Sequence, residues 1–153
     1  MFKNKSILIT GGTGMIGSHL VELLSKTSKV RITSHKRDIP YEINPKKVEI
    51  LHGDLTDKEF SDKAVKGIDY VFHLAARVYG IMGNLTHKTQ SIHDNLLINT
   101  NVVEASRVNN VKKIMKNSYK YSERKSYALN DEIIKQNRFT LAYLLFKRRK
   151  TSK

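Results

Sequence analysis

Short apolar runs alternate with helically spaced apolar residues over the first 111 residues of the chain. A strand that is buried on both faces of a sheet shows a short, continuous apolar run rich in β-branched residues. Four runs have this form: 6–10, 30–33, 48–51 and 70–74. The first of them is followed at once by Gly11 and Gly12, which indicates a sharp turn at the end of that strand.

Three helices are predicted around these strands. The first has apolar residues at helical spacing, Ile16, Leu20, Leu23 and Leu24. The second covers 57–65, with Thr56 as its N-cap and Glu59 completing a capping box. The third covers 94–109 and is expected to bury Leu97, Ile98, Val102, Val103 and Ala105. Because parallel neighbouring strands need crossover connections, the alternation predicts an α/β fold with a doubly wound parallel sheet.

Charge divides the chain into two differently composed parts. The whole chain has 28 basic and 14 acidic residues, which gives a formal net charge of +14. Residues 1–111 carry 15 basic and 11 acidic residues, whereas residues 112–153 carry 13 basic and 3 acidic ones. The positive excess therefore belongs to the tail, where a basic end could lie on nucleic acid or an anionic membrane surface. No interleaving of aromatic and basic residues supports specific nucleic-acid recognition, and a solvated basic end is the simpler interpretation.

The residue types that the chain lacks exclude several kinds of site. It has no cysteine, which excludes disulfides, thiolate catalysis and thiolate metal sites and fits a reducing cytoplasm. Its six histidines have no metal-binding spacing, so no metal is predicted. No apolar stretch approaches the roughly 18 residues of a membrane span. We therefore expect a cytoplasmic protein.

The candidate chemistry begins directly after the first strand, in a glycine-rich turn. Gly11 allows the chain to turn tightly, Gly14 lets the backbone approach a pyrophosphate, and Gly17 lets the following helix pack closely on the strand. The helix N-terminus offers unpaired N–H groups and a partial positive charge to the phosphates. An ordinary turn is the alternative, but the placement between a buried strand and a helix favours dinucleotide binding. The predicted contacts in the turn are Gly11, Thr13, Gly14, Met15, Ile16 and Gly17.

Four segments follow one another in the order found in a known family. They are the glycine-rich turn, 53–57, 71–76, and Asn95 with 101–105. Together they resemble the extended short-chain dehydrogenase/reductase family, over residues 5–114, and within it the NAD-dependent epimerase/dehydratase group that acts on nucleotide sugars. Residues 76–84 are similar to the matching segment of the GDP-L-fucose synthases.

The resemblance implies a Rossmann-type sheet whose C-terminal part is incomplete or irregular. It also implies the NAD(P)-binding portion of a nucleotide-sugar epimerase, dehydratase or reductase, which would transfer hydride to or from a sugar carbon. A dinucleotide and a nucleotide sugar are then the expected partners. A non-catalytic NAD(P)-binding protein or an inactive fragment is the alternative.

The resemblance further implies roles for residues at the strand ends. Asp54 and Leu55 would hold the adenine end of the dinucleotide, and Asn95 would flank the site on its helix. The residues implied to lie along its ribose and nicotinamide side are Leu74, Ala75 and Ala76. Each has a structural alternative: a turn or cap for Asp54, a helix start for Asn95, and close packing for the alanines. Their order beside the glycine-rich turn favours the binding roles.

The choice between NAD and NADP is predicted from charge after the second strand. An NAD site usually places Asp or Glu there, which binds the ribose hydroxyls and repels a 2′-phosphate. This chain has Ser34, Lys36 and Arg37 at that place, and Asp38 only afterwards. Lys36 or Arg37 could pair with the phosphate, and Ser34 could donate a hydrogen bond to it. NADP is favoured over NAD, with a solvated basic loop as the alternative.

The segment after Val111 departs from the family pattern. The resemblance implies an apolar fifth strand that ends in Ser or Thr. Here the segment contains Lys116, and an unpaired charge inside a buried strand costs several kcal/mol. We therefore expect this strand to be malformed or exposed.

The resemblance also implies a Tyr-x-x-x-Lys pair, in which the tyrosine is the general acid/base and the lysine lowers its pKa. Tyr121 and Lys125 have this spacing but follow the strand too soon. Tyr127 stands in a more suitable neighbourhood, but Asp131 occupies the place of the lysine and would raise the pKa of the tyrosine. The remaining alternative is that the chain has no competent pair.

These observations divide the chain into an NAD(P)-binding region, 1–114, and a divergent basic tail, 115–153, with one or two helices. Adjacent lysine codons at Lys112-Lys113 can form an adenine run, so we place a frameshift there as a hypothesis. It predicts a truncated family member with little or no catalytic activity. Loss of the fifth strand would also expose a sheet edge and the apolar helix faces that should cover it, which predicts marginal stability and association, in the simplest case as a homodimer.

Overall fold

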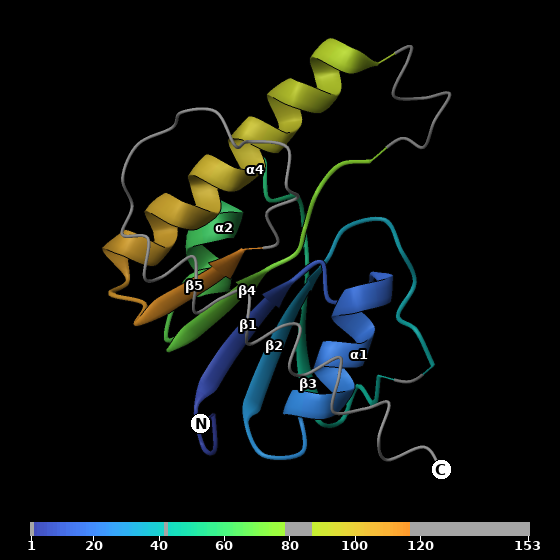
Figure 1. Cartoon of the computed structure of the whole chain (residues 1–153), viewed down its shortest axis with the longest axis vertical. Coiled ribbons are helices and arrows are strands. Elements are labelled where there is room, and N and C mark those ends of the chain that lie inside the picture. The colour runs from blue at the N-terminus through green and yellow to red at the C-terminus, as the bar shows by residue number, and fades with distance from the viewer. Residues whose placement is uncertain (1, 42, 79–86, 117–153) are drawn as a thin grey trace. The chain divides into compact units, whose positions relative to one another are not determined.

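The computed structural model describes residues 2–41, 43–78 and 87–116 (Figure 1). The chain divides into two compact units, Met1–Met115 and Lys116–Lys153. Apart from Lys116, every residue described below belongs to the first unit.

Strands and helices alternate in the described residues, as the apolar pattern predicts. The strands are β1 (Ser6–Thr10), β2 (Lys29–Ser34), β3 (Val48–His52), β4 (Tyr70–His73) and β5 (Lys113–Lys116). The helices are α1 (Met15–Leu24), α2 (Lys58–Val65) and α4 (Lys88–Val108). The sheet has the order β3-β2-β1-β4-β5, and β1 pairs in parallel with both β2 and β4. The predicted Rossmann-type α/β fold is confirmed.

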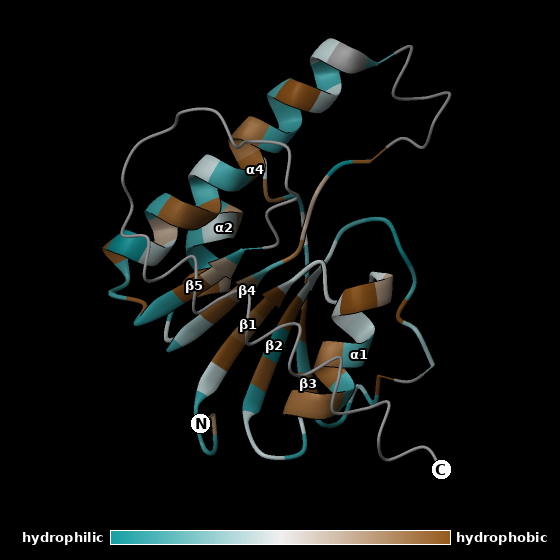
Figure 2. Cartoon of the chain, viewed as in Figure 1, coloured by the Kyte–Doolittle hydropathy of each residue, from teal (hydrophilic) through white to brown (hydrophobic). Residues whose placement is uncertain are grey.

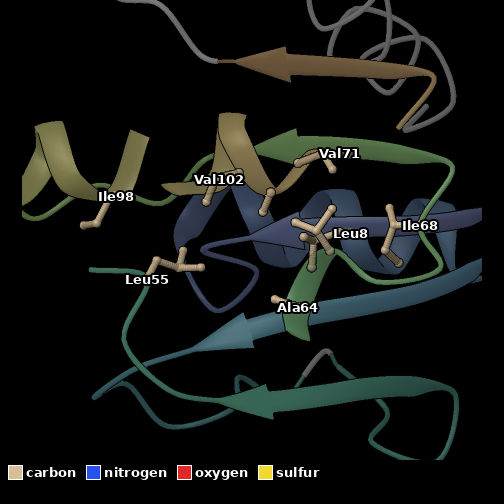
Figure 3. Close-up of a cluster of buried hydrophobic side chains, with 9 residues drawn as sticks. Leu8, Leu55, Ala64, Ile68, Val71, Ile98 and Val102 are labelled. Carbon is tan, nitrogen blue, oxygen red and sulfur yellow. The ribbon is translucent and has the colours of Figure 1, made fainter. Parts of the chain in front are cut away.

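Helices cover both faces of this sheet. Helix α1 packs on one face and buries Leu20, Val21 and Leu24. Helices α2 and α4 lie against the opposite face, where buried apolar side chains form a cluster (Figure 3). Its members are Leu8, Leu55, Ala64, Val65, Ile68, Val71, Ile98, Val102 and Ala105. Figure 2 shows β1 as largely apolar and α4 as a mixture of apolar and polar residues, because only one side of α4 is buried.

Helix α4 differs from its prediction at its start and in its buried face. It begins at Lys88 rather than at Asp94. Leu97 and Val103, both predicted to be buried, are 37% and 47% exposed. The apolar pattern marks only the turns that pack on the cluster, whereas polar contacts hold the first turns. The exposed positions flank the buried face, and apolarity alone did not distinguish them from it.

The N-cap of α2 is Asp57 and not Thr56. The Asp57 carboxylate accepts a hydrogen bond from the Glu59 N–H at 2.9 Å, which satisfies one of the unpaired donors of the first turn. Thr56 instead belongs to the preceding turn, where its N–H donates to Asp54 Oδ1 at 3.0 Å. The prediction of a capping box was therefore wrong by one residue, because both side chains can cap.

Strand β5 forms at the edge of the sheet beside β4. Its Met115 is buried, while Lys116 occupies the last position and is exposed. The expectation was a malformed or exposed strand. A regular strand forms, so malformation is wrong, and it lies at the edge of the sheet with the Lys116 side chain exposed, which avoids the cost of burying its charge.

Candidate functional site

A cavity of about 430 Å³ opens at the carboxyl ends of the strands. The chain leaves β1 toward β2 on one side, while β4 pairs with β1 on the other, so the cavity lies where the strand order reverses. Its wall is formed by Gly11, Thr13 and Gly14 after β1, 33–37 at the end of β2, 53–55 after β3, 74–78 after β4, and Ile98 of α4. The cavity thus brings together most of the predicted dinucleotide contacts from four separate segments. Those outside its wall are Met15, Ile16, Gly17 and Asn95.

The glycine-rich turn is packed too closely for side chains at three of its positions, Gly11, Gly12 and Gly17. Gly11 has a φ of +67°, and a Cβ there would lie 2.9 Å from the Ala75 nitrogen. A Cβ at Gly17 would overlap the carbonyl oxygen of Gly11. The turn therefore fits tightly between the end of β4 and the first turn of α1, as its sequence predicts.

The N-terminus of α1 faces the cavity through Gly14, its N-cap. The Gly14 N–H donates to Gly11 O at 3.0 Å, and the first hydrogen bond of the helix runs from Ser18 N to Gly14 O at 2.8 Å. The N–H groups of 15–17 therefore have no partner within the helix. A Cβ on Gly14 would meet only Gly11 O, at 3.2 Å, so the space in front of it is open. Such a cradle fits an anionic phosphate group.

Met15 and Ile16 were predicted as dinucleotide contacts, but they are not among the residues that line the cavity. They are 80% and 37% exposed. Any contact from these two residues would therefore be made by the backbone.

The loop after β2 places Lys36 and Arg37 on the cavity wall. Ser34 is buried beneath them, and its hydroxyl donates to the carbonyl oxygen of Arg37 at 2.9 Å. The hydrogen bond from Ser34 to a phosphate, which the sequence predicts, would require this contact to break. In the structure the serine shapes the basic loop.

Asp54 lies on the cavity wall after β3 and is bound by three groups. Its Oδ1 accepts from Thr56 N, and its Oδ2 lies 2.8 Å from Arg77 Nη2 and 3.3 Å from His35 Nε2. Partial burial alone would raise the pKa of this carboxyl, but the hydrogen bonds from Thr56 and Arg77 outweigh burial and hold the pKa below its ordinary value. Asp54 is therefore a carboxylate at neutral pH, paired with a cation.

Asn95 holds the backbone of Arg77 rather than lining the cavity. The Arg77 N–H donates to Asn95 Oδ1 at 2.8 Å, and Asn95 Nδ2 donates to Arg77 O at 2.9 Å. The two bonds fix the end of the 74–78 segment to α4. In this structure Asn95 thus acts on the cavity wall through Arg77.

A buried polar network behind the turn escaped the sequence analysis. Thr10 Oγ1 lies 2.7 Å from His73 Nδ1 and accepts hydrogen bonds from Leu74 N and Ala75 N at 3.1 and 3.2 Å. His73 Nε2 lies 3.1 Å from Asn99 Oδ1. The network ties the ends of β1 and β4 to α4. Its signal in the sequence is a polar residue at the end of each of two apolar strands.

Arg77 also escaped the sequence analysis. Its guanidinium contacts Asp54 after β3 and Asp94 of α4, which is buried. A single cation directly after the alanine pair was visible in the sequence, but its two partners lie 23 positions before and 17 positions after it. Only the fold brings them together.

The catalytic candidates Tyr121, Lys125 and Tyr127 lie outside the described residues, as do residues 79–84 of the segment that is similar to GDP-L-fucose synthases. Among residues 2–41, 43–78 and 87–116, no three His, Asp or Glu side chains are grouped so that they could hold a metal ion. In the same residues no helix is long and apolar enough to cross a membrane.

A glycine-rich turn and an open helix N-terminus at the reversal of a parallel sheet define a dinucleotide-binding α/β protein. Comparison with known families makes this specific. Residues 7–128 match the model of the NAD dependent epimerase/dehydratase family, and the chain belongs to that family. The match runs past residue 114, where the resemblance read from the sequence ends. The frameshift hypothesis for Lys112-Lys113 stays a prediction.

The relatives of this chain include nucleotide-sugar epimerases. UDP-glucose 4-epimerase of Rickettsia bellii (strain RML369-C) is 31% identical over 125 residues, which cover 75% of this chain and 36% of the relative. The structure of UDP-N-acetylglucosamine 4-epimerase from Methanobrevibacter ruminantium M1, in complex with UDP-N-acetylmuramic acid, shares 27% identity with a TM-score of 0.66, covering 94% of this chain and 50% of that one. The structure of Pen from Bacillus thuringiensis shares 28% identity with a TM-score of 0.67. The match covers 76% of this chain and 37% of that one. The chain thus spans about a third of the length of the curated epimerase.

Proposed function

We propose that this chain is the NAD(P)-binding portion of a nucleotide-sugar epimerase, dehydratase or reductase. The observation that carries the proposal is the open N-terminus of α1, where Gly14 leaves room for a phosphate beside unpaired N–H groups. When bound, the dinucleotide would accept hydride from a sugar carbon or return it. Family membership supports this chemistry, because the family is NAD-dependent.

The residues of this chain would bind and orient the dinucleotide. The backbone of 15–17 would hold its phosphates, and Ala75 and Ala76 would allow its close approach to β4, because neither carries bulk toward the cavity. Asp54 and Leu55 would lie at the adenine end. Asn95 would keep this wall in place through the Arg77 backbone.

A UDP-sugar is the proposed substrate of the whole protein, and 4-epimerisation is the proposed reaction. The names of two relatives, UDP-glucose 4-epimerase and UDP-N-acetylglucosamine 4-epimerase, support both points. The local similarity to GDP-L-fucose synthases rests on residues 76–84 alone and is outweighed by similarity over 125 residues.

The proposal includes a preference for NADP(H) over NAD(H). Lys36 and Arg37 line the cavity at the end of β2, where an acidic residue would select NAD. Two cations there favour the additional 2′-phosphate. A cytoplasmic location completes the proposal, because a chain without cysteine fits a reducing compartment. A homodimer stays a prediction to be measured by its mass in solution.

Titration calorimetry of the folded protein with NADP(H) and NAD(H) tests the binding proposal. We expect both to bind and NADP(H) to bind more tightly, and we expect Lys36→Ala/Arg37→Ala to remove most of that difference. If the folded protein binds neither dinucleotide, the proposed function is wrong. If the two dinucleotides bind equally, or the double variant keeps the preference, only the NADP assignment fails.

A further inference from the structure

Arg77 connects three segments around the cavity. Its backbone is held by Asn95 of α4 through two hydrogen bonds. Its Nη2 lies 2.8 Å from Asp54 Oδ2, and its Nε lies 3.3 Å from Asp94 Oδ2. The side chain is only 22% exposed, and the residue lines the cavity. Arg77 is therefore a fixed cation in the wall, with a carboxylate on each side.

The charges on the cavity wall depend on this contact. The charged or titratable lining residues among those described are His35, Lys36, Arg37, Asp54 and Arg77. Asp54 is the one carboxylate in that set. Its negative charge lies on the wall that carries the two cations proposed to select NADP(H), and its Oδ2 pairs with the Arg77 guanidinium at 2.8 Å and lies 3.3 Å from His35 Nε2.

We propose that Arg77 determines the dinucleotide specificity of this site, by neutralising Asp54 so that the cavity accepts the additional phosphate of NADP(H). The inference rests on the proposed function, since it concerns the same site. Without Arg77, the carboxylates of Asp54 and Asp94 would lose their shared cation and repel any anion in the cavity. The repulsion acts more strongly on NADP(H) than on NAD(H), because a 2′-phosphate adds nearly two negative charges.

The opposing explanation is that Arg77 is a structural link and nothing more. A link of that kind would affect both dinucleotides alike, since its loss would loosen the wall that both of them touch. The ratio of the two affinities therefore separates the two roles, whereas the stability of the protein does not.

The test measures the affinity of the folded protein for NADP(H) and NAD(H) by calorimetry, in wild type and four variants. Arg77→Gln should lower the ratio of NADP(H) to NAD(H) affinity by about three- to tenfold, and Arg77→Lys should keep the ratio near that of wild type. In the double variant Arg77→Gln/Asp54→Asn, the ratio of NADP(H) to NAD(H) affinity should recover most of its wild-type value, because the Asp54 carboxylate that Arg77 neutralised is then absent. Raising the salt concentration should shrink the effect of Arg77→Gln.

Arg31→Gln is the matched control. Arg31 is also an ordered arginine, with 19% side-chain exposure, and it pairs with Glu49 and with the carbonyl oxygens of Ala64 and Lys66. It does not line the cavity. Its loss should lower stability and leave the affinity ratio unchanged.

Each outcome decides one question. A wild-type protein that binds neither dinucleotide overturns both the proposed function and this inference. Equal losses for the two dinucleotides in Arg77→Gln, with no return in the double variant, overturn the inference alone. If Arg77→Gln does not fold, Asp54→Asn in the wild-type background replaces it. That variant should raise the ratio by about two- to threefold, and an unchanged or lowered ratio refutes the inference.

Discussion

Adding a side chain at Gly14 or at Gly17 is predicted to have different effects: a loss of dinucleotide affinity at Gly14 and a loss of stability at Gly17. Gly17 packs against backbone: an added Cβ would overlap the Gly11 carbonyl oxygen and lie 2.8 Å from the Gly12 Cα. Gly14 has a φ of −78° and a ψ of 168°, and its Cβ would meet only the Gly11 oxygen, at 3.2 Å. Gly17 is therefore required for close packing, whereas Gly14 leaves space for the ligand.

A side chain at Gly17 should lower the unfolding free energy, because the atoms that its Cβ would overlap belong to the backbone of Gly11 and Gly12 and cannot shift easily. Overpacking of this kind costs about 1–3 kcal/mol, and overlap with backbone places it at the upper end. Replacing glycine by alanine inside a helix recovers about 0.5–1 kcal/mol. We expect Gly17→Ala to lose about 2 kcal/mol of unfolding free energy, which lowers the melting temperature by about 4–8 °C in a chain of this size.

The cost at Gly14 should appear in binding and not in stability. Valine readily adopts the extended backbone conformation that Gly14 has, so Gly14→Val should change the unfolding free energy by less than about 1 kcal/mol. Its methyl groups would fill the space in front of the N–H groups of 15–17. Affinity for either dinucleotide should fall by more than about tenfold, or about 1.4 kcal/mol.

Thermal unfolding and calorimetry on the same preparations provide the assay, with Gly67→Ala as control. Gly67 has a φ of +76° and nothing within 4 Å of its Cβ position, so alanine there should cost about 1 kcal/mol without touching the cavity. Wild-type affinity in Gly14→Val would refute the placement of the pyrophosphate. Wild-type stability in Gly17→Ala would refute the packing argument.

Two further predictions concern stability. Thr10→Val should lose about 1–3 kcal/mol in urea unfolding, because His73 Nδ1 and the Ala75 N–H lose their contact with the hydroxyl, whereas the Leu74 N–H keeps the Thr10 carbonyl oxygen at 3.2 Å. Thr10→Ser should lose much less, and equal losses would contradict the network. The folded-state pKa of Asp54 lies below its ordinary 3.8, so the unfolded chain takes up this proton first as the pH falls. The unfolding free energy should therefore decrease below about pH 5, and Asp54→Asn should lessen the decrease; the same pH dependence in both proteins would refute this.

Local sequence sufficed for the first four strands and for the glycine-rich turn, but not for β5, where Lys116 led to the expectation of a malformed or exposed strand. A short β-branched run such as 6–10 is typical of a buried strand, and glycines between such a strand and a helix favour a phosphate-binding turn. The start of α4 could not be found in this way, because polar contacts hold its first turns and leave no apolar period. Likewise, the pattern could not separate the buried Val102 from the exposed Val103.

Contacts between segments that are distant in the sequence were the other feature that the sequence could not predict. Lys36 and Arg37 were found because their distance from the glycine-rich turn is nearly constant in such folds. The pairing of Arg77 with Asp54 and Asp94 depends on how the loops after β3 and β4 meet helix α4 in the fold, which no local pattern encodes. The sequence therefore identified most of the residues that line the cavity, while the partners of Asp54 came from the structure alone.

The network behind the turn also fixes where its protons lie. Thr10 Oγ1 accepts from two backbone N–H groups, so its own proton must point to His73 Nδ1. The imidazole is then the tautomer that carries hydrogen on Nε2, and this hydrogen is donated to Asn99 Oδ1. A hydrogen on His73 Nδ1 would face the Thr10 hydroxyl hydrogen, so that two donors would oppose each other. The order of donors and acceptors thus runs in one direction, from the end of β1 to α4.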